Sequence, residues 1–244
     1  MLIAWLLVAV AGFAIGATSI GGVLVVPALH HWMGLGIADA MAISSQAFCW
    51  TGLWVLLRLP RLGLDLLQRE RMLLAAALLG AVLGAWLTTR VPAPWIRSWI
   101  GALALLSGAY GLWQARAYAG STQVGAWPGT PAQAALGLLV GAGSALSGTG
   151  GPVMLLPLLM LRRCAFERSV EVALVLQVPI AMAATATHAT AGRLDLGYGM
   201  AVAGVLLVSA EMGRRLSRRW SRRALQAGTA LLLIGTGLWL FWIG

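Results

Sequence analysis

Two polar, glycine-rich stretches interrupt long apolar runs of this chain: Gly16-Ala17-Thr18-Ser19-Ile20-Gly21-Gly22 and Ser147-Gly148-Thr149-Gly150-Gly151-Pro152. The runs that they interrupt cover residues 2–29 and 133–160. Shifting the sequence by 130 positions superposes the two runs, with Ser19 on Thr149 and Gly21 on Gly151. This self-similarity indicates that the chain consists of two homologous copies of one unit.

Six shorter apolar segments make up the rest of the two copies: 40–57, 72–88, 96–114, 170–190, 198–213 and 224–243. The match between the copies continues into these segments, with Gln46 on Gln177. Residues 115–132 are rich in Gly, Pro, Ser and Thr, which is typical of a linker. We therefore divide the chain into a first membrane repeat (1–114), a linker (115–132) and a second membrane repeat (133–244).

The composition indicates that the chain lies in a lipid bilayer. Hydrophobic residues make up 60% of it and charged residues only 10%, far from the usage of soluble domains. A helix needs about 20 apolar residues to cross the hydrocarbon core, and the eight segments have lengths of this order. We expect an all-α integral membrane protein.

The basic residues indicate how these segments are oriented. The net charge of +10 does not point to nucleic-acid binding, because most of the 17 basic residues lie in short loops between apolar segments. All except Arg90, Arg97 and Arg193 fall within 58–71, at Arg116, within 162–168 or within 214–223. Cytoplasmic loops carry an excess of arginine, so we expect 58–71, 162–168 and 214–223 to face the cytoplasm of a bacterial inner membrane.

The excess of arginine on one side of the membrane is strong only if the run 133–160 enters and leaves the membrane on the same side. The repeat argues for the same hairpin in 2–29. Each copy then has one hairpin and three spans, and an odd number of spans inverts the second copy relative to the first, as in many secondary transporters. The alternative is a continuous but broken helix for each run, which would measure about 42 Å against a core of about 30 Å.

The two interruptions predict a site for an anion. Broken backbone at membrane depth is tolerated only inside protein or beside a watery cavity. A half-helix starting after each break would present free N–H groups and a partial positive charge, with Ser19 or Thr149 as its N-cap and Pro152 in its first turn. The predicted substrate-binding residues are Thr18, Ser19, Gly21, Gly22, Ser45, Gln46, Ser147, Thr149, Gly150, Gly151 and Gln177. Tight helix packing through small side chains is the other interpretation of these residues.

Two ionisable residues, His188 and Glu211, are the candidates for proton coupling. Interhelical hydrogen bonding by His188 and a local ion pair of Glu211 with a following arginine are the simpler interpretations. We expect no metal, cofactor or catalytic set. The two cysteines are far apart, and the apolar segments hold no Ser/His/Asp set or carboxylate pair.

The paired breaks, followed by Pro27 and Pro157, resemble the TauE/SafE family of sulfite and organosulfonate exporters over nearly the whole chain. Members of that family look like two repeats that each open with Gly-x-x-x-Gly-x-Gly-Gly-Gly-x-x-x-x-Pro. The glycine run is shortened here to Ser19-Ile20-Gly21-Gly22 and Thr149-Gly150-Gly151-Pro152. The resemblance implies a permease for sulfite, sulfoacetate or a related organosulfur anion.

The resulting hypothesis is a secondary permease, not an enzyme, that exports a small sulfur-containing anion by alternating access, with proton coupling as an option. Its partners are the anion and the lipid bilayer, and the small residues on its helix faces are compatible with a homodimer. Two competing functions stay open, a membrane scaffold without transport and a permease for another small anion. The scaffold predicts that Gly21 and Gly151 tolerate larger side chains wherever packing allows.

Overall fold

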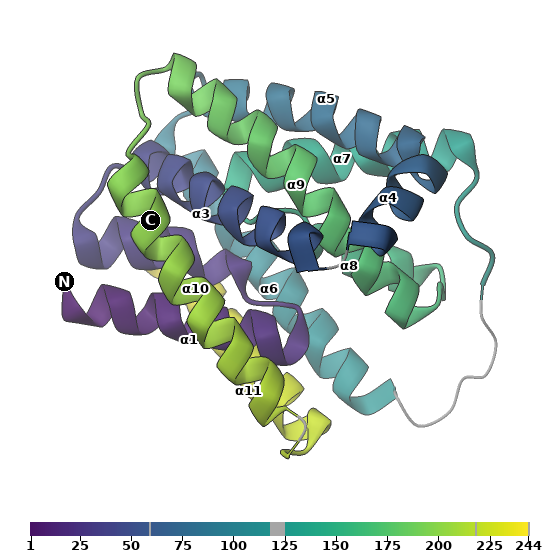
Figure 1. Cartoon of the computed structure of the whole chain (residues 1–244). Coiled ribbons are helices and arrows are strands. Elements are labelled where there is room, and N and C mark those ends of the chain that lie inside the picture. The colour runs from purple at the N-terminus through teal and green to yellow at the C-terminus, as the bar shows by residue number, and fades with distance from the viewer. Residues whose placement is uncertain (59, 118–124, 218, 244) are drawn as a thin grey trace.

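The computed structural model describes residues 1–58, 60–117, 125–217 and 219–243. Every regular element in this part of the chain is helical (Figure 1), which confirms the expected all-α fold. In chain order, the elements are α1 (Leu2–Thr18), η1 (Gly22–Leu24), α2 (Val25–Pro27), η2 (Ala28–Trp32), α3 (Ile37–Arg58), α4 (Pro60–Arg69), α5 (Arg71–Leu87), α6 (Ala93–Ala117), α7 (Thr130–Ser147), α8 (Pro152–Leu161), α9 (Phe166–Thr190), α10 (Leu196–Leu216) and α11 (Arg222–Ile243).

The helices have the length and surface of a membrane protein. Within the described residues, four are long and apolar enough to cross a bilayer: α3, α9, α10 and the Arg223–Trp242 part of α11. Shorter apolar helices are α1, α5 and α8. Large apolar side chains such as Leu139, Val208 and Leu231 are more than half exposed, whereas Ser44 and Gln46 are buried. Apolar groups outside and polar groups inside are what a bilayer solvent favours.

Both long apolar runs fold back on themselves at their glycine-rich breaks. After α1 the chain returns along it, so that η2 contacts α1. A Cβ added to Gly21 would lie 2.9 Å from the Cβ of Ala14, in the helix that the chain has just left. In the second run, α8 returns along α7, where Gly143 lies against Met154. Each run is therefore a hairpin in space rather than one long helix.

Each half packs its first helix against the other half. Helix α1 lies against α10 and α7 against α5, while α6 pairs with α11 and α3 with α9. Gly12 and Gly16 face the backbone of α10, and Gly137 and Gly141 face the backbone of α5. Small residues at this spacing let membrane helices approach closely. If the two halves are exchanged, the pair α1–α10 becomes α7–α5, and the pairs α6–α11 and α3–α9 stay the same. Two copies related by a two-fold axis would show this pattern.

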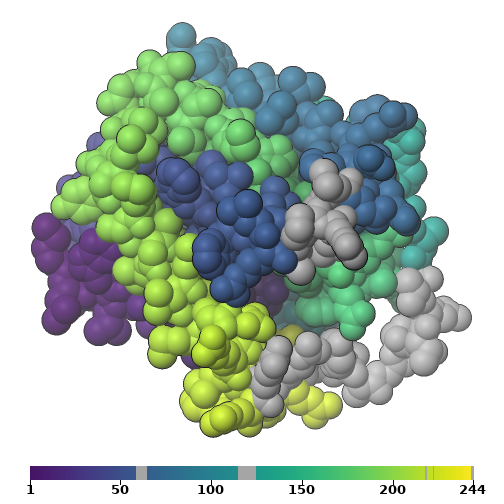
Figure 2. Space-filling model, in the orientation of Figure 1, coloured from purple at the N-terminus to yellow at the C-terminus, as the bar shows by residue number. Residues whose placement is uncertain are grey.

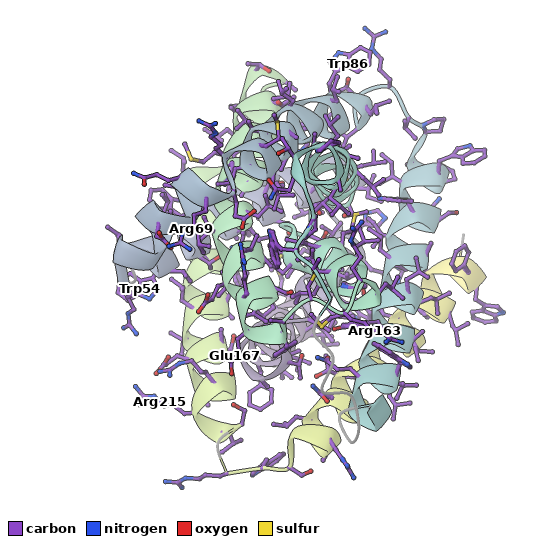
Figure 3. The ribbon with its side chains drawn as sticks, turned by 90° about the vertical axis from the view of Figure 1, so that its right-hand side faces the viewer. Trp54, Arg69, Trp86, Arg163, Glu167 and Arg215 are labelled. Carbon is purple, nitrogen blue, oxygen red and sulfur yellow. The ribbon has the colours of Figure 1, made fainter. Side chains whose placement is uncertain are left out.

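Two of the arginine-rich regions meet at one end of the bundle. Region 58–71 is not the loop we expected, because the amphipathic helix α4 occupies most of it. The residue after α4, Glu70, bonds to Arg168 from region 162–168. Figure 3 places Arg163 and Arg215 in the lower part of the view and Trp86, near the end of α5, at the top.

The predicted linker is described only at its edges. Helix α6 continues to Ala117 and α7 begins at Thr130, so the linker limits of 115 and 132 fall inside helices. Residues 118–124 lie outside the described residues.

On the face shown in Figure 2, α3 lies between α9 and α10, which it contacts on its two sides.

Candidate functional site

The second break joins α7 to α8 through residues with unusual backbone angles. Gly148, which ends α7, has a φ of 65°, and Gly150 and Gly151 have φ values of 81° and 109°. Residues with a side chain rarely adopt such angles, because their Cβ would crowd the backbone. Pro152 then lies in the first turn of α8, as predicted, where its missing N–H leaves no bond unmade.

Two buried hydroxyls line this break. The Oγ of Ser147 lies 2.8 Å from Oγ1 of Thr149 and 2.9 Å from the carbonyl oxygen of Gly143. When Ser147 donates to Gly143, Thr149 donates to Ser147. The Thr149 hydroxyl has no other hydrogen-bond partner among the described residues. Its proton can therefore turn to a ligand, while Ser147 keeps its bond to the backbone.

The backbone of the second break also offers donors. The N–H groups of Gly150, Gly151 and Val153 have no hydrogen-bond partner within the described part of the chain. All three residues are buried. The N–H groups of Met154 and Leu155 donate back to the carbonyl oxygen of Gly151. Buried N–H groups nearly always have a partner in native proteins, so three of them around one turn make this break a candidate binding position.

The first break is built differently. Ser19, which ends α1, has a left-handed φ of 61° although it carries a side chain. Gly21 has extended backbone, and the chain then forms a 3₁₀ turn, a single α turn and a π turn instead of a regular helix. The Thr18 hydroxyl donates to the carbonyl oxygen of Ala14 at 2.8 Å and lies 3.0 Å from that of Ile20. This hydroxyl is already bonded within its own break.

The predicted N-caps are wrong. Gly21 precedes η1 and Gly151 precedes α8, and neither Ser19 nor Thr149 begins a helix. Ser19 instead ends α1, because a left-handed residue turns its N–H back to the last carbonyl groups of a helix. Its structural counterpart is Gly148, not Thr149. The second break is therefore one residue longer than the first.

The two breaks touch each other beneath α3. A Cβ added to Gly22 would lie 2.8 Å from the carbonyl oxygen of Thr149 and 3.0 Å from the ring of Phe48. Gly150 lies against the same ring. Ser44 of α3 donates to the carbonyl oxygen of Gly148 at 2.7 Å. Sequence analysis did not select Phe48, since a lone aromatic residue in an apolar helix gives no signal of this contact.

The predicted residues of α3 and α9 divide into two groups. Gln177 of α9 lies near Gly151 and donates to the carbonyl oxygen of Phe48 at 2.9 Å. Ser45 is buried within α3. Gln46 turns toward the start of α10, where its amide faces the backbone N–H and C=O of Asp195. The structure thus brings Gln177 to the second break and directs Gln46 to a helix end.

The two candidates for proton coupling have different surroundings. His188 is fully buried in α9, and neither of its ring nitrogens has a hydrogen-bond partner among the described residues. Glu211 of α10 accepts hydrogen bonds from Arg214 at 2.7 Å and from Arg215 at 2.6 Å. Glu211 therefore makes the local ion pairs that its position suggested, whereas His188 makes no such contact.

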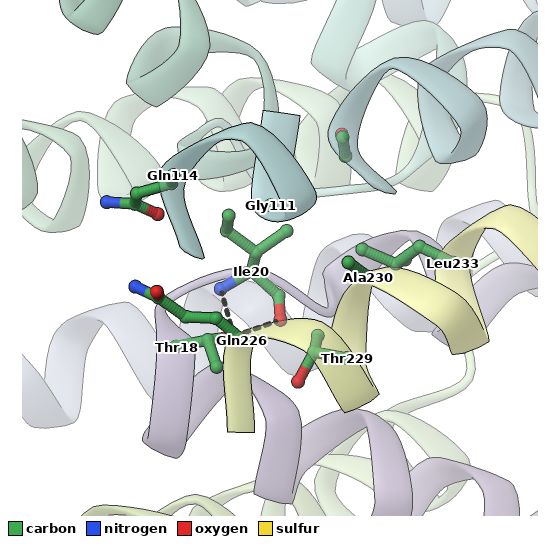
Figure 4. Close-up of a pocket in the computed structure, with 9 residues that line it drawn as sticks. Thr18, Ile20, Gly111, Gln114, Gln226, Thr229, Ala230 and Leu233 are labelled. Atoms are coloured by element: carbon green, nitrogen blue, oxygen red, sulfur yellow. Dashed lines mark hydrogen bonds between the residues drawn. The ribbon is translucent and has the colours of Figure 1, made fainter. Parts of the chain in front are cut away.

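A small crevice adjoins the first break (Figure 4). Thr18 and Ile20 form one side of it, and α6 and α11 form the other. The polar side chains in its lining are Ser107, Gln114, Gln226 and Thr229. Sequence analysis missed them, although Ser107 and Gln114 are two turns apart on one face of an apolar helix, which is a recognisable signal.

Comparison with known proteins identifies the family. A family model described as sulfite exporter TauE/SafE matches residues 2–240, which include both breaks and all the helices that pack around them. No curated protein and no solved structure matches the chain. The family match covers essentially the whole chain, and it agrees with the membrane-protein fold. The chain therefore belongs to the sulfite exporter TauE/SafE family, which consists of membrane transporters rather than enzymes.

Proposed function

We propose that this protein is a secondary permease that carries sulfite or an organosulfonate out of the cell across the bacterial inner membrane. The observation that carries the proposal is the group of donors at the second break that are either unpaired among the described residues or bonded only to another side chain. It comprises the N–H groups of Gly150, Gly151 and Val153 and the hydroxyl of Thr149. Glycine lets a ligand approach the N–H groups of Gly150 and Gly151 closely, because neither residue has a Cβ.

The chemistry of these donors suits a sulfur oxyanion. Sulfite and sulfonates present three oxygen atoms around one sulfur, and each oxygen accepts hydrogen bonds. The start of α8 adds a partial positive charge, which favours an anion at this position. Neither break contains an arginine. Neutral donors hold the anion without a strong ion pair, so that it is released as readily as it binds.

The first break supplies the opposite wall of the proposed site. The N–H groups of Gly21, Gly22 and Val23 also have no hydrogen-bond partner among the described residues. Gly22 approaches the carbonyl oxygen of Thr149, so both sets of donors lie close to one place. The Thr18 hydroxyl is bonded locally, and we expect it to contribute less than that of Thr149.

The arrangement of the halves supports transport by alternating access. The equivalent pairs α1–α10 and α7–α5 support an inverted repeat, in which rocking of one half against the other exposes the site to each side in turn. The contact between regions 58–71 and 162–168 supports placing both at the cytoplasmic side. His188, buried without a partner, is the residue that we favour for proton coupling.

Counterflow in proteoliposomes tests this function. Vesicles preloaded with unlabelled sulfite, sulfoacetate, sulfate or chloride are diluted into labelled sulfite, and uptake of label is followed. We expect sulfite and sulfoacetate, but not chloride, to drive uptake. Thr149→Ala should weaken uptake, and the matched variant Thr149→Ser, which keeps the hydroxyl, should retain it. Absence of uptake with every anion from well-folded protein would exclude the sulfite assignment.

A further inference from the structure

A half-buried ion pair joins the two halves at one end of the bundle, and the side chain of its arginine, Arg168, is 43% exposed. Glu70, directly before α5, has a side chain only 1% exposed, and its Oε1 accepts from Nη2 of Arg168 at 2.7 Å. Its Oε2 accepts from Nε1 of Trp127 at 3.0 Å. The guanidinium of Arg168 also lies over the Trp127 ring, 4.1 Å from its centre. Both carboxylate oxygens thus have a partner from beyond the first half.

A second, looser ion pair lies at the other end. Nε of Arg193 is 3.9 Å from a carboxylate oxygen of Asp39, and the two side chains are 31% and 53% exposed. Arg168 is near the start of α9, and Arg193 follows its end. Since α9 has 25 residues, the two pairs are separated by roughly the helix length of about 37 Å.

The two pairs occupy corresponding segments of the two halves, with the charges exchanged. Arg168 is the third residue of α9, and Asp39 is the third residue of α3. Glu70 directly precedes α5, and Arg193 lies in the short connection before α10. In the sequence repeat, α3 corresponds to α9 and α5 to α10. Each ion pair therefore joins the start of one helix, α9 or α3, to the segment before a helix of the other half, α5 or α10 respectively.

We propose that these two ion pairs are the latches of the two gates, Arg168–Glu70 at the end with the arginine-rich loops and Asp39–Arg193 at the opposite end. One latch closes while the other opens. The proposal rests on the proposed function, because only alternating access requires two gates. The short contact of the first pair, 2.7 Å, and the long contact of the second, 3.9 Å, then describe one conformation, closed at the Arg168 end. An arginine–carboxylate pair suits this role, since it is strongly directional when dry and readily hydrated when opened.

A cysteine of the chain, Cys164, can report on opening of the Arg168–Glu70 latch. Cys164, between α8 and α9, is 5% exposed, and its Sγ lies 3.8 Å from the carbonyl oxygen of Ala126, next to Trp127. Cys49 is the other cysteine of the chain. In a Cys49→Ala background, the rate at which N-ethylmaleimide alkylates Cys164 therefore measures opening at the Arg168 end. Interpreting this alkylation rate requires no assumption about which anion is transported.

The test compares variants of the two latches in this background, in proteoliposomes. Glu70→Gln removes the charge of the buried partner and should raise the alkylation rate about tenfold. Arg168→Lys keeps the charge but loses the guanidinium that contacts both Glu70 and the Trp127 ring, and should raise the rate even if Glu70→Gln does not fold. Asp39→Asn weakens the opposite latch and should leave the rate unchanged or lower it, because it favours closure at the Arg168 end.

Two results would overturn the latch. One is an equal alkylation rate in the parent protein, Glu70→Gln and Arg168→Lys. The other is an equal increase in Asp39→Asn, which would indicate general loosening of the bundle. If the rates change as expected while counterflow of labelled sulfite is absent from the parent protein, the latch is supported and the cargo assignment alone fails.

Discussion

The two breaks start alike and continue differently. Each ends a helix with a left-handed residue, Ser19 in the first and Gly148 in the second. Beyond that point, Gly150 and Gly151 lead into the regular ten-residue helix α8, whereas the first break passes into short irregular turns. A duplicated sequence therefore does not give two equal candidate sites. The second break has the regular helix start and a hydroxyl that is bonded only to the Ser147 side chain, and we place the main contacts of the anion there.

The largest effect is expected from Gly150→Val. Gly150 has a φ of 81°, and a Cβ there would lie 2.9 Å from the Phe48 ring. A β-branched residue at positive φ costs about 1–3 kcal/mol, and overpacking adds a similar amount. We expect more than a tenfold loss of sulfite counterflow and a lower melting temperature. The control is Gly204→Val, where a Cβ would meet nothing within 4 Å, and equal behaviour of the two variants would contradict the role of the second break.

Gly22→Ala tests the contact between the breaks. The added methyl group would lie 2.8 Å from the carbonyl oxygen of Thr149, so the two breaks must separate. We expect a destabilisation of about 1–3 kcal/mol, measured as a lower melting temperature of the purified protein, together with slower counterflow. Gly228→Ala is the matched control in an open helical position, and should be neutral or slightly stabilising. A melting temperature for Gly22→Ala at or above that of the parent protein would mean that the breaks are not in contact.

Ser19→Gly is expected to have the smallest effect, and in the opposite direction. Ser19 holds a left-handed φ of 61°, which costs a residue with a side chain about 1–2 kcal/mol. Glycine removes this strain but loses more backbone entropy on folding, leaving a net gain of about 1 kcal/mol. Thermal unfolding should therefore shift upward by a few degrees, with counterflow retained. A large loss of transport would show that the Ser19 side chain has a role that the structure does not explain.

Much of the fold could be predicted, because its signals are local in the sequence. The all-helical class follows from apolar segment lengths, and the two breaks follow from glycine and proline spacing. Pro152 lies in the first turn of α8, as the pattern predicts, because proline is tolerated at few positions in a helix. Helix α4 was missed because its arginines were interpreted as loop residues, although an amphipathic helix at a membrane surface carries the same charges.

The candidate site was predictable in outline but not in its contacts. Gln46 and Gln177 match in the repeat, yet one turns to Asp195 and the other to Phe48, because different neighbours surround them in the fold. Ser19 and Thr149 also match, but only Ser19 ends a helix, since the second break has an extra residue. The ungapped repeat does not show that α7 ends one residue earlier than α1.

Equilibrium binding of labelled sulfite to the purified protein tests the central claim most directly, when Thr149→Ala is compared with Thr18→Ala. The Thr149 hydroxyl is available to a ligand, and a hydrogen bond to a charged group contributes about 1.5–3 kcal/mol, so its loss should weaken binding about tenfold or more. The Thr18 hydroxyl is bonded to Ala14, and its loss should leave the Kd for sulfite within about twofold. Equal weakening by both substitutions, or weakening by Thr18→Ala alone, would contradict the placement of the anion at the second break.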